Sequence, residues 1–122
     1  MAVRIIDING KRAAAEEDYL SAERFDCVSV GSLGVYYRDL LHVKFIPYAC
    51  MERVFLRIQE VNGKMCCGST VFQYFRLVFV CGGREIADCM SENESAFRAA
   101  LDKIRVAAPY LPIGVAAQGS EQ

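Results

Sequence analysis

Two dipeptides, Asn62-Gly63 and Gly82-Gly83, each separate two runs in which apolar and polar residues alternate, and this pattern constrains the fold most. Both central residues of a type I′ turn need positive φ, so such dipeptides between alternating runs are the strongest local signal for a β-hairpin. The expected core face of these strands carries Val54, Leu56, Ile58, Phe75, Leu77 and Phe79. We therefore predict half-buried antiparallel strands joined by two hairpins.

A turn at Asn62-Gly63 also predicts the register of the first hairpin. Counting outward from the turn, Val61 pairs with Lys64, Gln59 with Cys66, and Ile58 with Cys67. Successive strand side chains point to opposite faces, so Cys67 is expected on the core face and Cys66 on the other. The adjacent cysteines are thus expected in a return strand, where they do not easily share one ion or one pocket.

Three more short runs, rich in valine and aromatic residues, precede these hairpins at residues 24–30, 33–39 and 41–46. They predict a meander of strands in which Gly31-Ser32 joins the first pair. Residues 3–8 predict a further strand. Residues 11–22 contain mainly helix formers and predict a short helix or an ordered lead-in.

The hydrophobic period changes after residue 90. Ser91 with Glu94 three residues later has the spacing of a capping box. The apolar residues that follow fall on one helical stripe, at Phe97, Ala100, Leu101, Ile104 and Ala108. We predict an amphipathic helix of about four turns that ends at Pro109, because the residue before a proline disfavours helix. The remaining residues are expected to form a docked or frayed tail.

The expected order is about seven short antiparallel strands and then one C-terminal amphipathic helix, in a mainly β, α+β fold. It resembles the pleckstrin-homology-like (PH-like) superfold, a seven-stranded bent barrel capped by a C-terminal helix. The segments that resemble its bacterial branch are GVYYRD, FIPYACMERVFLRI and SENESAFRAALDKI. The resemblance implies a PH-like barrel with its helix over residues 23–108, a lead-in over 1–22 and a tail over 109–122. The whole chain also resembles uncharacterised small proteins of anaerobic gut bacteria. A split α+β sheet with different connectivity is the alternative fold.

Composition narrows the class of protein. The chain has 122 residues, of which 53% are hydrophobic, as expected of a single domain with its own core. Its net charge of −1 gives no overall basic field, so we expect no nucleic-acid partner. Asp7 interrupts the only segment that resembles a signal peptide, and no apolar run approaches the roughly 20 residues of a membrane helix. We therefore expect a cytoplasmic protein with six free thiols.

The sequence favours a binding protein over an enzyme. His42 is the single histidine and is expected to be a solvated residue on an exposed strand face with Lys44, so a Cys-His enzyme is disfavoured. The cysteines lack the C-x-x-C spacing of a metal site, so we expect no metal and no cofactor. With His42 as the only histidine, we also expect no catalytic residue. A structural zinc or thiol-redox site is the alternative, and it would draw on Cys50, Cys66, Cys67, Cys81 and Cys89.

Aromatic and arginine side chains alternate on the strand faces opposite the expected core. These residue types are enriched in interface hot spots, and packing under the helix or the N-terminal segment is the competing interpretation. The candidate binding residues are Tyr36, Arg38, Arg53, Phe55, Arg57, Tyr74 and Arg76. They predict a protein partner or a homodimer. A membrane-surface lipid site is the other alternative, but the loop VGSLGV lacks the positive charges that lipid-binding PH domains carry there, so a lipid partner is disfavoured.

Overall fold

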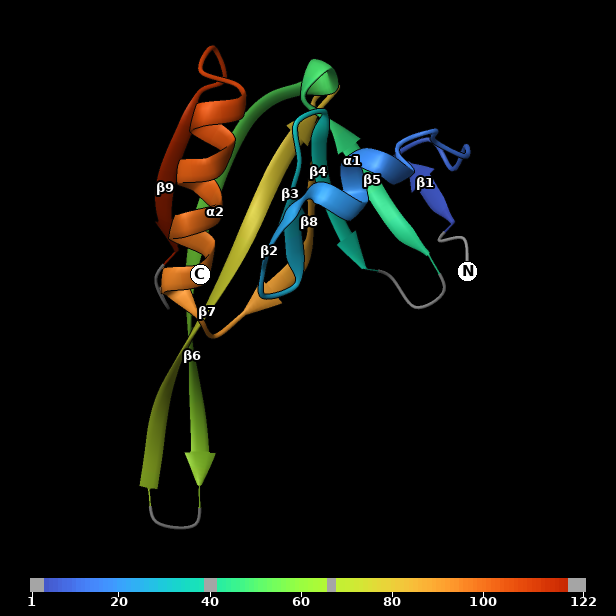
Figure 1. Cartoon of the computed structure of the whole chain (residues 1–122). Helices are drawn as coiled ribbons and strands as arrows, with labels where there is room; N and C mark the ends of the chain where they lie inside the picture. The colour runs from blue at the N-terminus through green and yellow to red at the C-terminus, as the bar shows by residue number, and fades with distance from the viewer. Residues whose placement is uncertain (1–3, 39–41, 66–67, 119–122) are drawn as a thin grey trace.

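The computed structural model describes residues 4–38, 42–65 and 68–118, and in these residues the chain forms two sheets and two α-helices (Figure 1). The first sheet has the strand order β1-β5-β4-β3-β2 and the second the order β8-β7-β6-β9. The elements are β1 (Ile5–Asp7), α1 (Glu16–Ser21), β2 (Glu23–Phe25), β3 (Val28–Val30), β4 (Gly34–Arg38), β5 (Val43–Pro47), the 3-10 turn η1 (Tyr48–Cys50), β6 (Met51–Met65), β7 (Gly68–Cys81), β8 (Arg84–Ser91), α2 (Glu94–Ala107) and β9 (Ile113–Gln118).

The first sheet contains the predicted meander with one change. Residues 24–30 were expected to form a single strand, but they divide into β2 and β3 around a tight turn. Asp26 adopts a positive φ of 60° in this turn, which aspartate tolerates better than most residues. The predicted N-terminal strand is present as β1, and it pairs in parallel with β5.

The second sheet contains the predicted hairpins, but the predicted position of the first turn, at Asn62-Gly63, is wrong. Both residues lie within β6, where Asn62 pairs with Val71, and the chain reverses between Met65 and Gly68. In the predicted register Leu56 would face Ser69, whereas the observed register places Leu56 opposite Leu77. Apolar pairs along the whole ladder therefore override the local preference of the dipeptide for a turn.

The expected pairing of Gln59 with Cys66 and of Ile58 with Cys67 is wrong for the same reason. Gln59 pairs with Tyr74, and Ile58 pairs with Phe75. The side chains of Cys66 and Cys67 lie outside the described residues, so the predicted faces of these two cysteines stay predictions.

The second predicted turn is confirmed. Cys81 pairs with Arg84, and the two residues between them, Gly82 and Gly83, have φ values of 58° and 77°. These are the positive values that a type I′ hairpin requires.

The hairpin of β6 and β7 extends beyond the rest of the second sheet (Figure 1). β9 pairs with β6 only as far as Gln59, and β8 pairs with β7 only from Phe75 onward. Beyond these residues, toward the tip of the hairpin, the described parts of β6 and β7 pair only with each other.

The predicted C-terminal helix is confirmed as α2, with a different cap. Asn93, and not Ser91, is the N-cap, and its side chain accepts a hydrogen bond from the backbone N–H of Ala96. Ser91 instead ends β8. The helix stops at Ala107, and the predicted tail continues as β9, which pairs in parallel with β6.

Two apolar clusters hold these elements together. The larger lies between the two sheets and α2, and all five residues of the predicted helical stripe are buried in it. The smaller lies on the opposite side of the first sheet, beneath α1 and the N-terminal segment. It contains Ile5, Ala15, Tyr36, Val43 and Phe45. The first sheet is therefore covered on both faces.

The mainly β, α+β class is confirmed, whereas the antiparallel arrangement is not. The described strands form two open mixed sheets, with parallel pairs β1–β5 and β6–β9. Neither helix in the described part of the chain is long and apolar enough to span a membrane.

Candidate functional site

The seven predicted binding residues divide between the two sheets. Five of them share the face of the second sheet that points away from the large core: Arg53, Phe55, Arg57, Tyr74 and Arg76. We call these five residues the arginine face. Tyr36 and Arg38 lie on β4 of the first sheet, so the structure does not bring them to this face.

Tyr36 is a core residue and not a surface residue, contrary to the prediction. Its side chain is fully buried, and its ring lies between those of Tyr19 and Phe45, with centroids 5.3 and 4.8 Å away. The competing interpretation, packing under the N-terminal segment, is correct for this residue. Arg38 is exposed at the end of β4.

The Tyr36 hydroxyl donates a 2.6 Å hydrogen bond to the carboxylate of Asp18 in α1. The same carboxylate accepts the backbone N–H groups of Ser32 and Leu33, at 2.8 and 3.0 Å. Burial alone would raise the pKa of Asp18, but these three hydrogen bonds outweigh it and hold the pKa below its ordinary value of 3.8. Burial raises the pKa of Tyr36, and the bond to Asp18 reinforces this.

Asp18 therefore fastens α1 to the loop between β3 and β4. A Cβ atom on Gly31 would collide with the Asp18 carboxylate, so a larger residue here would displace Asp18 from its hydrogen bonds. From sequence Asp18 belonged to an acidic run with Glu16 and Glu17, which is usually a solvated face. Only the fold brings it to a loop 14 residues away.

The arginine face is built on a buried aromatic ring. Phe55 lies opposite Val78 on the far side of the second sheet, and both are buried although neither belongs to the core between the sheets. The guanidinium carbons of Arg53 and Arg57 lie 4.6 and 5.2 Å from the centroid of the Phe55 ring. The arginines thus cover the ring in cation–π geometry and present their charges outward.

Positive charge is concentrated at the centre of this face. Arg57 and Arg76 lie directly opposite each other across β6 and β7, where like charges are destabilising. Arg57 donates through Nη2 to both carboxylate oxygens of Glu85, at 3.1 Å each. The Nε atoms of Arg57 and Arg76 are buried and have no hydrogen-bond partner among the described residues. Within the arginine face only the charge of Arg57 is paired with a carboxylate among the described residues, so the charge of Arg76 is left for an anionic group.

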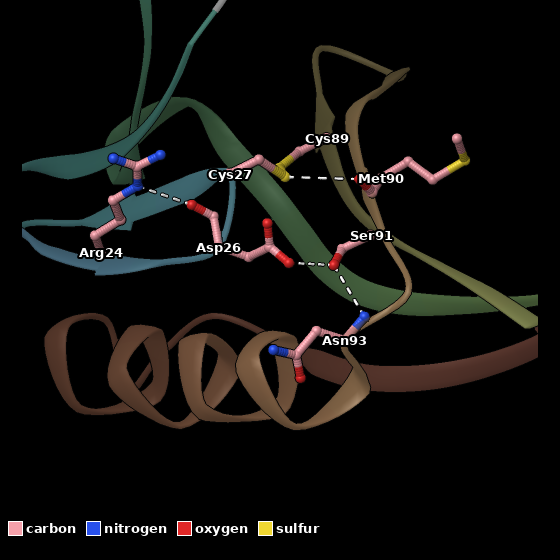
Figure 2. Close-up of a disulfide and its surroundings, with 7 residues drawn as sticks. All are labelled: Arg24, Asp26, Cys27, Cys89, Met90, Ser91 and Asn93. Carbon is pink, nitrogen blue, oxygen red and sulfur yellow. Dashed lines mark hydrogen bonds between the residues drawn. A yellow bond between two sulfur atoms is a disulfide. The ribbon is translucent and has the colours of Figure 1, made fainter.

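Cys27 and Cys89 form a disulfide that joins the turn between β2 and β3 to β8 (Figure 2). The expectation of six free thiols is therefore wrong. The sequence separates these residues by 62 positions and contains no signal for their pairing, which arises because the two sheets face each other. Structural disulfides are uncommon in the cytoplasm, so this bond argues against the expected location.

Hydrogen bonds reinforce the disulfide on either side (Figure 2). Arg24 Nε donates to the backbone carbonyl of Asp26 at 2.9 Å, across the turn. The Ser91 hydroxyl donates to the Asp26 carboxylate and accepts the backbone N–H of Asn93 at 2.9 Å. The turn is thereby tied to the start of α2 as well as to β8.

A second pair of cysteines lies at the other end of β7. The Sγ atoms of Cys50 and Cys81 are 3.6 Å apart, and both residues are free thiols. Burial raises the pKa of Cys81 to about 12, and the contact with Cys50 and the charge of Glu52 add to this effect.

A metal site does not assemble in the described part of the chain. No three side chains of histidine, cysteine, aspartate or glutamate converge there in a way that could hold a metal ion.

A surface hollow of about 640 Å³ lies beside the disulfide, and its lining is Asp26, Tyr74, Met90, Ser91, Glu92 and Asn93. His42 is half-buried at the start of β5.

No protein-family model, curated protein or solved structure matches the chain.

Proposed function

We propose that the chain is a non-catalytic binding module whose arginine face recognises an acidic segment of a partner protein. The observation that carries the proposal is the placement of Arg57 directly opposite Arg76, whose charge has no carboxylate partner among the described residues. A like-charge pair across two strands costs stability unless a negative group compensates for it. Glu85 compensates for part of the charge of Arg57, because both of its carboxylate oxygens accept from Arg57 Nη2.

The chemistry of the face supports a carboxylate-bearing partner. The guanidinium group is planar and offers donors in pairs, which match the two oxygens of a carboxylate. Phe55 holds two guanidinium groups against its ring, so part of their conformational freedom is already lost before a ligand binds. Tyr74 is half-buried at the margin and adds an aromatic group of the type that interfaces favour.

We also propose that the chain is related to the PH-like superfold. The order of strands followed by a C-terminal helix supports this relationship. The parallel pairs β1–β5 and β6–β9 differ from the antiparallel strands expected of that superfold. The Cys27–Cys89 disulfide supports an oxidising compartment over the cytoplasm.

The experiment is a binding assay with a short, fluorescently labelled peptide rich in glutamate, and a lysine-rich peptide as its control. We expect saturable binding of the acidic peptide alone, with an affinity that falls as salt screens the charges. Sedimentation of the protein over a range of concentrations tests the homodimer. Self-association without binding of the acidic peptide would replace the proposal with the homodimer.

A further inference from the structure

The thiols of Cys50 and Cys81 are in contact, and regular secondary structure places both residues. Cys50 ends η1, and the next residue, Met51, pairs with Cys81 across β6 and β7. The two sulfurs are 3.6 Å apart and would need to approach by about 1.5 Å to reach the disulfide bond length of about 2.05 Å. Cys50 is half-buried, whereas Cys81 is only 4% exposed. Cys50 is therefore the more exposed residue of the pair, and its sulfur contacts that of the buried Cys81.

We propose that Cys50 and Cys81 are a second redox pair of the protein, which a low-molecular-weight disulfide oxidises to an intramolecular disulfide. The proposal goes beyond the binding function and does not depend on it.

The reaction has two exchange steps. The Cys50 thiolate attacks one sulfur of the small disulfide, whose S–S bond breaks and releases one thiolate, leaving a mixed disulfide on Cys50. Cys81 then loses its proton to solvent and attacks the Cys50 sulfur, which expels the second small thiolate. The two cysteines lose two electrons and two protons in total, and the small disulfide is reduced to two thiols.

The difference between the two thiols sets this order of attack. Cys50 is accessible and reacts first, because a small disulfide cannot approach the buried Cys81 sulfur directly. The raised pKa of Cys81 keeps it protonated near neutral pH, so it serves as the slower, resolving thiol.

The new bond would give the fold a second crosslink. Cys27–Cys89 joins the β2–β3 turn of the first sheet to β8 of the second. A bond between Cys50 and Cys81 would join η1, the connection between the two sheets, to the end of β7. The oxidised protein would then carry two disulfides, Cys27–Cys89 and Cys50–Cys81. We expect its Tm to exceed that of the protein with Cys27–Cys89 alone by on the order of 10 °C.

Peptide mapping of the whole chain tests the proposal, because trypsin separates these cysteines. Cleavage after Lys44, Arg53, Arg76 and Arg84 places Cys50 on peptide 45–53 and Cys81 on peptide 77–84. Cys66 and Cys67 fall together on peptide 65–76. The protein is reduced, freed of reductant, incubated with oxidised glutathione, alkylated and digested in urea without reduction.

We expect a mass that joins peptide 45–53 to peptide 77–84, and its loss when dithiothreitol is added before alkylation. Recovery of both peptides only in the alkylated form, or of Cys50 linked to peptide 65–76, would overturn the proposal. The variant Cys81→Ala adds an independent readout, since Cys50 should then accumulate as its mixed disulfide with glutathione. An alkylated Cys50 in that variant would contradict the proposed order of attack.

Discussion

The Tyr36 hydroxyl donates a hydrogen bond to the carboxylate of Asp18, with the two oxygens 2.6 Å apart. This bond links the middle strand of the first sheet to α1, and the same carboxylate accepts two backbone N–H groups of the β3–β4 loop. One ionised side chain thus holds the N-terminal segment over the smaller apolar cluster. Its contribution to stability can be measured separately from that of the disulfide.

Replacement of Asp18 by asparagine should lower the free energy of unfolding by about 2 kcal/mol at pH 7, because three hydrogen bonds lose their charged acceptor. Urea denaturation of the two proteins gives this difference. Glu17→Gln is the matched control, since Glu17 is exposed in the same helix, and it should change stability by less than about 0.5 kcal/mol. Equal stabilities for Asp18→Asn and the wild type would contradict the assigned role.

The contribution of Asp18 should depend on pH in one direction. Its pKa in the folded state lies below the ordinary value of 3.8, so the stabilisation is present above that value and is lost as pH falls through the folded pKa. The difference in unfolding free energy between wild type and Asp18→Asn should therefore stay constant from pH 7 to about pH 5 and shrink toward pH 2. A difference that grows on acidification would show that the sign of the pKa shift is wrong.

Two buried tyrosines, Tyr36 in β4 and Tyr48 in η1, should differ when each is replaced by phenylalanine. Tyr36 donates to a carboxylate, whereas Tyr48 donates to the backbone carbonyl of Gly31 at 2.7 Å. Bonds to charged groups contribute more, so we expect losses of about 2 kcal/mol for Tyr36→Phe and about 1 kcal/mol for Tyr48→Phe. The ranking is measured by urea denaturation at pH 7, and the reverse order would contradict it.

Removal of the Cys27–Cys89 disulfide by the double substitution Cys27→Ala and Cys89→Ala should destabilise the protein by about 4 kcal/mol, because the bond closes a loop of 62 residues. Thermal unfolding of both proteins, each carrying Cys50→Ala so that no second crosslink can form, measures the loss. An unchanged Tm would mean that the crosslink does not constrain the unfolded chain.

The sequence predicted the elements that depend on local pattern. The stripe from Phe97 to Ala108 and the glycine turn at Gly82-Gly83 needed only neighbouring residues, and both are present. The Asn62-Gly63 turn failed because register is set by the entire ladder, which places Leu56 opposite Leu77.

The candidate site was predicted only in part for a related reason. Alternation correctly placed Arg53, Phe55 and Arg57 on one face, since that follows from strand geometry. Tyr36 obeys the same alternation, but its face is covered by α1, and no local pattern showed that the N-terminal segment would return over it. The Cys27–Cys89 disulfide also depends on how the two sheets meet, and the contact of Cys50 with Cys81 depends on the register of β6 with β7.

The most direct test of the binding proposal compares two variants that lose the same two positive charges. Arg57→Gln with Arg76→Gln removes them from the arginine face, and Arg98→Gln with Arg105→Gln removes them from the exposed side of α2. Anisotropy titrations with the glutamate-rich peptide should show affinity weakened by at least about tenfold for the first variant and nearly unchanged for the second. Equal affinities for the two variants would contradict the assignment of the arginine face as the binding surface.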